Sequence, residues 1–338
     1  MDNFELICPA GTPAALRAAV DAGADAVYLG FRDETNARNF PGLNFTRQDV
    51  ADAVDYAHAR RVEVYVAVNT YPQAGNLGPW RKAVDDAARL KVDAVILADP
   101  GLLDYAAKRH PDLRLHLSVQ ASAANVEAIR LYRDAFGVRR VVLPRVLTVP
   151  EIARLNAEID IETEVFVFGG LCPMAEGRCS LSSYATGLSP NKQGVCSPAN
   201  HVRYEQRGGA LASTLGGFTI NVFGEGEQAG YPTLCKGRFV AGAGAGEAAG
   251  DGNGPAYLFE EPTSLNAMDL LPELKAAGVR ALKIEGRQRG KAYIAAVVRA
   301  YREALDSFAA GRVVPRIDLQ AMVEGGTQTT GAYTRGWR

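Results

Sequence analysis

The sequence predicts an α/β fold: a TIM-like (β/α)8 barrel, irregular in places, with a Cys-rich insertion at its C-terminal mouth. The first observation is a repeated unit in which a short strand rich in Val, Ile and Leu precedes an Ala-rich amphipathic helix. Such strands form parallel sheets that are buried on both faces. The second observation is that seven units precede residue 169 and a late strand lies near residue 281. A doubly wound open sheet has the same periodicity and is the alternative.

The elements follow one another in a regular order. Thr12 precedes Pro13, and Asp99 precedes Pro100, so each pair places a capping side chain before a first-turn proline. The expected strands are 5–9, 26–31, 63–69, 94–99, 114–120, 140–145, 162–168 and 281–285. The expected helices are 13–22, 46–60, 78–90, 101–109, 124–135, 150–156, 265–277 and 290–309.

No shift in composition marks a domain boundary, so residues 1–338 are expected to form a single barrel domain. The strand–helix pattern stops at residue 169. Residues 169–262 are rich in Gly, Ser, Pro and Cys, and four of the five cysteines lie there. Within this segment, residues 241–254 consist almost entirely of Gly and Ala, a composition typical of surface loops. We therefore expect 169–262 to be an insertion within the barrel domain.

Composition limits the classes of function. The net charge is −1 and the pI about 6.5, so no global positive field exists to attract nucleic acid. The N-terminus has no basic and apolar leader pattern, and no apolar run is long enough for a membrane helix. A cytoplasmic protein without membrane insertion is expected. The cytoplasm is reducing, so the five cysteines need an explanation other than disulfides.

Four cysteines form the strongest candidate site. Their spacing is Cys172-x6-Cys179-x16-Cys196-x38-Cys235, in a Gly- and Pro-rich region outside the regular core. Four thiolates are the number that an iron–sulfur cluster or a tetrahedral zinc ion requires. Zinc sites usually contain close Cys-x2–4-Cys pairs, which this spacing lacks, so a cluster is favoured. Four unrelated buried thiols are the other alternative. Cys8 lies inside the first strand and is expected in the core.

Polar residues at the ends of several predicted strands are candidates for substrate binding, because the carboxyl ends of barrel strands form the active site. Arg145 and Arg287 are preferred partners for an anionic ligand with carboxylates. Structural salt bridges are the alternative role for each. The strand-end candidates are Asn69, Gln120, Arg145, Lys283, Glu285 and Arg287. No catalytic residue can be assigned.

The first two cysteines lie in a recognisable motif. Residues 164–182 contain Glu-x-Phe, then Gly-Gly-Leu-Cys, then Gly-x-Cys-Ser. This segment resembles the signature of the collagenase-like peptidase family of uncertain catalytic type. Segments 9–11, 21–30, 37–40, 69–70 and 283–287 also match, so the resemblance covers about residues 5–305. The match at 37–40, Ala-Arg-Asn-Phe, adds Arg38 to the substrate-binding candidates.

Within that family, segments 177–184, 194–198 and 327–333 are most similar to the ubiquinone-biosynthesis branch. The resemblance implies a hydroxylase subunit that acts without oxygen on a ubiquinone precursor. It implies a 4Fe-4S cluster, held here by the four cysteines, and a heterodimer with a homologous partner. It also implies prephenate as a possible oxygen donor.

Three other functions remain open. The first is hydroxylation of tRNA or rRNA, as in other family members. Near-neutral charge and the absence of the C-terminal domain that such members tend to carry count against it. The second is a peptidase, although no Gly-x-Ser-x-Gly or His-Glu-x-x-His motif is present. The third is a non-catalytic scaffold whose cluster is structural.

Overall fold

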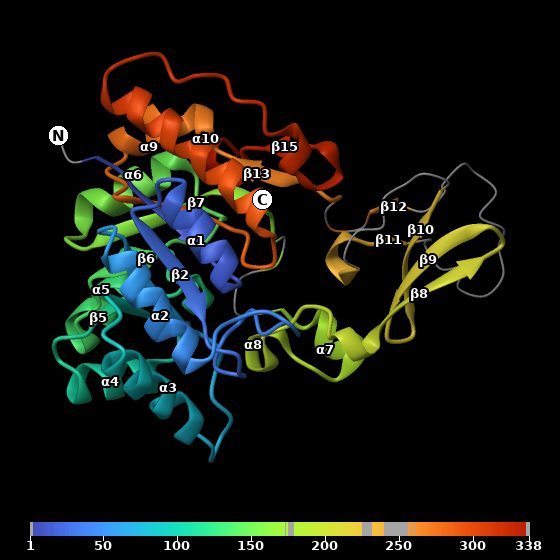
Figure 1. Ribbon diagram of the computed structural model, residues 1–338, viewed down its shortest axis with the longest axis horizontal. Coiled ribbons are helices and arrows are strands. Elements are labelled where there is room, and N and C mark those ends of the chain that lie inside the picture. The colour runs from blue at the N-terminus through green and yellow to red at the C-terminus, as the bar shows by residue number, and fades with distance from the viewer. Residues whose placement is uncertain are drawn as a thin grey trace.

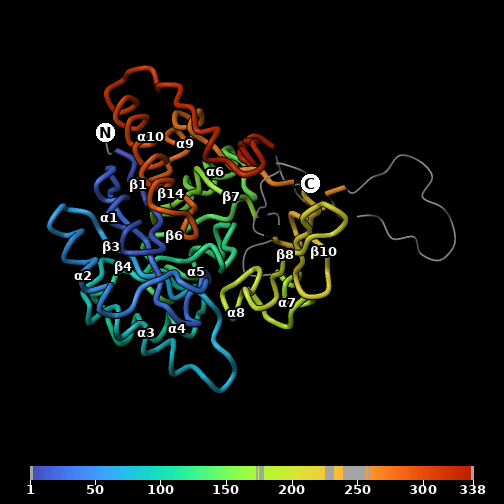
Figure 2. Tube along the Cα trace, turned by 45° about the vertical axis from the view of Figure 1, so that its right-hand side comes forward, coloured from blue at the N-terminus to red at the C-terminus, as the bar shows by residue number. Residues whose placement is uncertain are grey.

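Eight parallel strands close into a barrel, as Figures 1 and 2 show. The structure is a computed structural model that describes residues 3–172, 174, 179–224, 232–239, 256–257, 259 and 261–335. The strands β1 to β7 lie side by side in chain order, and β14 pairs with both β1 and β7. This double pairing closes the sheet. The predicted (β/α)8 barrel is therefore confirmed, and the open-sheet alternative is wrong.

The observed elements agree with the predicted barrel elements to within a few residues. The barrel strands are β1 (Glu5–Pro9), β2 (Ala26–Gly30), β3 (Glu63–Val68), β4 (Ala94–Leu97), β5 (Arg114–Leu117), β6 (Arg140–Val142), β7 (Glu162–Gly170) and β14 (Ala281–Ile284). The helices around them are α1 (Pro13–Asp21), α2 (Arg47–His58), α3 (Gly78–Arg89), α4 (Pro100–Arg109), α5 (Val126–Phe136), α6 (Val149–Glu158), α9 (Leu271–Ala276) and α10 (Lys291–Ala309).

Capping side chains begin several of these helices. The Thr12 hydroxyl accepts a hydrogen bond from the Ala15 backbone N–H, and Asp99 accepts one from the N–H of Leu102. Both caps were predicted, and each satisfies a donor that the first helical turn leaves unpaired. None of the helices in the described residues is long and apolar enough to cross a membrane.

One predicted helix, 265–277, is wrong in its first half. Ser264–Asn266 instead forms strand β13, which runs antiparallel to β7 and parallel to β15 (Gln328–Thr329). Helix α9 begins only at Leu271, and Pro272 lies in its first turn. Proline is tolerated there but not in a helix interior, so the helix cannot extend back through this position.

The insertion carries a small sheet that was not predicted. The elements of the insertion are α7 (Leu181–Thr186), α8 (Pro190–Gln193), β8 (Val202–Arg207), β9 (Ala210–Leu215), β10 (Phe218–Phe223), β11 (Arg238–Phe239) and β12 (Ala256–Tyr257). Strands β8 to β10 form an antiparallel sheet that projects beside the barrel in Figure 1. The Gly pairs 208–209 and 216–217 lie at its two turns and were the available hairpin signal. The predicted loop 241–254 lies outside the described residues.

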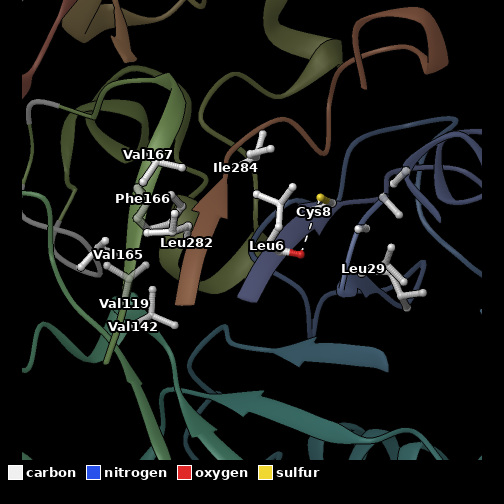
Figure 3. Close-up of a cluster of buried hydrophobic side chains, with 14 of the residues drawn as sticks. Leu6, Cys8, Leu29, Val119, Val142, Val165, Phe166, Val167, Leu282 and Ile284 are labelled. Carbon is white, nitrogen blue, oxygen red and sulfur yellow. Dashed lines mark hydrogen bonds between the residues drawn. The ribbon is translucent and has the colours of Figure 1, made fainter. Parts of the chain in front are cut away.

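Cys8 belongs to the hydrophobic core, as predicted. It is fully buried, and Figure 3 shows it near Leu6 and Leu29. Burial raises the pKa of its thiol far above the ordinary value, and the charge of Asp25 raises it further. A thiol that is neither accessible nor ionised is unsuited to nucleophilic attack.

Replacing Gly11 with alanine is expected to destabilise the fold by about 2 kcal/mol or more, because overpacking in a tight site costs about 1–3 kcal/mol. A Cβ atom at this position would lie 1.7 Å from the backbone oxygen of Arg287. Gly78 has no neighbour within 4 Å of such an atom, so Gly78→Ala is the matched control. Urea unfolding of both variants measures the difference; equal midpoints would contradict the prediction.

Candidate functional site

A cavity opens at the carboxyl ends of the barrel strands. Its empty volume is ≈ 540 Å³, a figure that includes the open solvent at its mouth. Four cationic side chains and one carboxylate line it. All seven residues predicted from strand ends and from the family motif lie on its wall, although their role in binding a substrate stays a prediction. They are Arg38, Asn69, Gln120, Arg145, Lys283, Glu285 and Arg287.

Two arginines reach the cavity from the ends of β6 and β14, which are separated only by β7. Arg287 is buried, and its Nη1 donates a hydrogen bond of 2.8 Å to Oδ1 of Asn36. Burial lowers the pKa of Arg287 to about 10, so it remains cationic at neutral pH. Arg145 donates from Nη1 to the carbonyl of Gly170 at 3.0 Å, and its guanidinium carbon lies 4.4 Å from the ring centre of Phe166. Both guanidinium groups are therefore held in place before any ligand arrives.

Asn69 shapes the cavity through its contacts with neighbouring loops. Its Oδ1 accepts a hydrogen bond of 3.0 Å from the Ala37 N–H, and its Nδ2 donates to the Ser118 hydroxyl at 3.3 Å. Gln120 accepts a bond from the Tyr71 hydroxyl at its backbone carbonyl. Asn69 thus connects the loop that carries Arg38 to the end of β3, and these hydrogen bonds give Asn69 a structural role.

A buried ionic network lies directly below the cavity. Nζ of Lys283 is 2.6 Å from Oε1 of Glu164, and both side chains are almost fully buried. Oε2 of Glu164 lies 3.5 Å from Nη1 of Arg140, which also pairs with Glu5 and Glu162. Only Lys283 among these residues also lines the cavity. The network therefore fixes the lysine at the cavity floor.

Sequence reasoning missed two charged residues inside the barrel, Glu164 and Arg140. They point into the barrel from β7 and β6, next to His116 of β5, and all three are fully buried. The available signal was a polar residue at an inward position of a strand that is otherwise apolar. Several of their polar atoms have no hydrogen-bond partner within the described residues: Oε2 of Glu164, Nη1 of Arg140 and both ring nitrogens of His116.

The four predicted cysteines lie around the barrel mouth as free, partly buried thiols. Cys172 follows β7, Cys179 precedes α7, Cys196 follows α8, and Cys235 lies in a short turn. Burial raises the pKa of Cys196 to about 11; Arg38 opposes this rise, and the charges of the other three thiols add to it. The four thiols are therefore near enough to influence one another's ionisation.

These positions bear on which group the thiols could hold. Among the described residues, no three His, Cys, Asp or Glu side chains gather tightly enough to hold a metal ion. A tetrahedral zinc ion, with Zn–S bonds of about 2.3 Å, needs sulfurs only about 3.8 Å apart. A four-iron cluster is larger and holds its cysteine sulfurs farther apart. Four free thiols are the donor set of either group, so the cluster stays a prediction.

The cysteine-bearing segment packs against the barrel loops. The Tyr71 N–H donates to the carbonyl of Asn191, whose side chain donates to the carbonyl of Cys179 at 3.1 Å. A Cβ atom on Gly194 would lie 2.2 Å from the carbonyl oxygen of Asn36. The segments that carry Cys179 and Cys196 are thus in direct contact with the mouth of the barrel.

Arg38 connects the cavity with the cysteines. It lines the cavity, and its Nε lies 3.8 Å from Oε1 of Glu285. Burial works against its charge, but the neighbouring charges of Cys196, Glu285 and Cys172 leave its pKa raised. One guanidinium group therefore faces both the ligand cavity and two of the four thiols.

The comparisons with known proteins agree on one family. The model of peptidase family U32 matches residues 11–337. The tRNA hydroxylation protein P of Haemophilus influenzae is 33% identical over 322 residues, which cover 91% of this chain and 68% of that protein. The tRNA hydroxylation protein P1 of Bacillus subtilis is 30% identical, with 90% of this chain and 64% of that protein covered.

A third relative is the 23S rRNA 5-hydroxycytidine C2501 synthase of Escherichia coli. It is 28% identical over 333 residues, which cover 96% of this chain and 42% of that protein. The chain thus spans between 42% and 68% of the length of these three relatives. A match over nearly the whole chain, together with the cysteine motif, establishes that the chain belongs to peptidase family U32.

Proposed function

We propose that this chain is an iron–sulfur subunit that supports oxygen-independent hydroxylation of an aromatic ring. The observation that carries the proposal is that Arg38 lines a cation-rich cavity and is also close enough to Cys196 and Cys172 for their charges to act on it. A redox group and a bound ligand would then share one site. The named relatives support hydroxylation as the reaction class, because three of them are hydroxylation proteins or a hydroxycytidine synthase by name.

Cys172, Cys179, Cys196 and Cys235 would hold a 4Fe-4S cluster. Such a cluster supplies one-electron chemistry. With one thiolate for each iron, the chain leaves no iron position open for a substrate, so electron transfer is the favoured role. The protein's own contribution is to bind the ligand beside the cysteines.

The cavity suits an anionic ligand that contains a ring. Arg145 and Arg287 would pair with carboxylates, and charge-assisted bonds from arginine are among the strongest available. Tyr28 and Phe166 line the same cavity and add aromatic surface for a cyclic ligand. Prephenate, a dicarboxylate with a ring, fits this chemistry as the oxygen donor.

Two substrate classes are candidates for the hydroxylated ring. The motif at 327–333 and the net charge of −1 favour a ubiquinone precursor, which would place the chain in the UbiU branch of the family. The names of the relatives favour RNA instead, and none of the three is named for ubiquinone. On the comparisons alone RNA is the better supported substrate, so the two must be separated by experiment.

A cytoplasmic heterodimer with a homologous UbiV-like chain is part of the ubiquinone proposal. The peptidase and scaffold alternatives have less support. Cys8 is buried and its pKa is raised, so it cannot serve as a protease nucleophile. A purely structural cluster would not require a cation-lined cavity beside the cysteines.

A deletion strain grown without oxygen tests the proposal. We expect it to lose either ubiquinone, with accumulation of an unhydroxylated precursor, or hydroxylated nucleosides in digested tRNA or rRNA. Mass spectrometry of quinones and nucleosides from the same culture distinguishes the two substrates. Wild-type protein and the Cys8→Ala variant should restore the product, whereas Cys196→Ser should not. Unchanged quinones and nucleosides would contradict the proposal.

A further inference from the structure

Lys283 has an unusual position for a lysine. It lies on β14 at the floor of the cavity, is 4% exposed, and is the one lysine among the described residues that line this space. Its Nζ lies 2.6 Å from Oε1 of Glu164 and 3.6 Å from the centre of the Tyr28 ring. A buried amine that faces a ligand cavity is the setting in which lysine acts as a nucleophile.

The surroundings can take up the proton that a nucleophilic amine must lose. Glu164 is bonded to the lysine through one oxygen, and its other oxygen has no hydrogen-bond partner among the described residues. Burial lowers the pKa of Lys283; Glu164 opposes this shift, while Arg287 and Arg140 add to it. A proton that moves from Nζ to Glu164 leaves the pair neutral, which suits its buried position.

The cavity also selects the kind of carbonyl compound. Arg287 lies 5.5 Å from the centre of the Tyr28 ring, the same ring that Lys283 contacts. A guanidinium group and an amine that share one aromatic neighbour are well placed for a carboxylate and a carbonyl on adjacent carbons. Arg38 and Arg145 add positive charge to the same wall. The matching ligand class is a 2-oxo acid.

We propose that Lys283 captures the carbonyl group of a 2-oxo acid as an imine in this cavity. The ammonium group first gives a proton to Glu164. The nitrogen lone pair then forms a bond with the carbonyl carbon. The carbonyl oxygen takes up one proton from the nitrogen and the proton held by Glu164, and leaves as water, so that a protonated imine remains beside the Glu164 carboxylate. A C=N double bond replaces the C=O double bond, so nothing is oxidised or reduced. The step goes beyond the proposed function, because it needs neither a cluster nor a ring substrate.

Reductive trapping tests this directly on the full-length wild-type protein. Pyruvate and sodium cyanoborohydride convert an imine into a stable secondary amine, which peptide mass spectrometry locates. We expect labelling of Lys283 to saturate with pyruvate and to be at least about tenfold faster than at an exposed lysine, because the reacting groups are positioned. Lys82 and Lys108, whose side chains are 70% and 76% exposed, are the internal controls.

Two variants sharpen the result. Arg287→Gln should raise the pyruvate concentration needed for half-maximal labelling, and Glu164→Gln should slow labelling at saturation. Labelling of Lys283 in the wild type that is no faster than at Lys108, or that does not saturate, would overturn the inference. Because trapping does not require iron, this failure is distinguishable from failure of the proposed function.

Discussion

Replacing Cys196 with serine is expected to abolish cluster binding. Protein purified without oxygen should contain about four irons and four sulfides per chain and absorb broadly near ~400 nm, and the variant should lose nearly all of both signals. The physical reason is that Cys196 lies close enough to the other three thiols and to Arg38 for their charges to act on it, which makes it one of the four expected ligands. Iron analysis, sulfide analysis and visible absorption measure the change.

Cys8→Ala provides the matched control, because it removes the fifth cysteine without touching the cysteine-bearing insertion. Its thiol is fully buried beside Leu6 in β1, so iron and sulfide content should stay at the wild-type level. Equal iron in the Cys196→Ser variant and the wild type would contradict the assignment of the ligands. Stoichiometric zinc in the wild type would support the zinc alternative instead.

Replacing Arg140 with methionine is expected to destabilise the protein strongly. The guanidinium group is fully buried and pairs with Glu5, Glu162 and Glu164. Removing one partner of a buried ion pair leaves an uncompensated charge and typically costs about 3–5 kcal/mol. Urea or thermal unfolding measures the loss, and Lys108→Met, which breaks an exposed ion pair, should be close to wild type.

Acid should reduce the difference between the Arg140→Met variant and the wild type. Burial tends to raise the pKa of Glu5, but Arg140 and Arg280 lower it below the ordinary value of 4.5. A carboxyl whose pKa is lowered on folding stabilises the native state above its unfolded pKa and loses that contribution as the pH falls. A gap that is constant between pH 7 and pH 3 would contradict this account of the network.

The strands and helices of the barrel could be predicted because each of them depends on its own short segment of the sequence. Each strand is a short apolar run and each helix begins at a recognisable cap, so element boundaries at Thr12 and Asp99 are visible in the sequence. Closure was predicted from the number of strand–helix units, because periodicity does not encode the pairing of β14 with β7 that closes the sheet. The error at 265–277 also comes from long-range pairing, because Leu265 joins a strand through Gly169 and Thr329, which are distant from it in the sequence.

The cavity wall was predictable from one geometric rule, and the barrel interior was not. Carboxyl ends of parallel strands meet at one face, which brought Asn69 and Arg145 to the cavity wall. Glu164 and Arg140 lie within the strands and below that face, where an apolar filling was expected. Their inward direction became visible only with the strand register.

The most direct test of the central claim is whether ligand binding in the cavity changes the EPR spectrum of the cluster. EPR spectra of the dithionite-reduced protein should change when prephenate or pyruvate saturates the cavity, and the change should be lost in Arg38→Gln. Such a result would show that Arg38 joins the cavity and the cysteines into one site. An EPR-silent protein, or a signal that is unchanged although calorimetry shows the ligand bound, would contradict that claim.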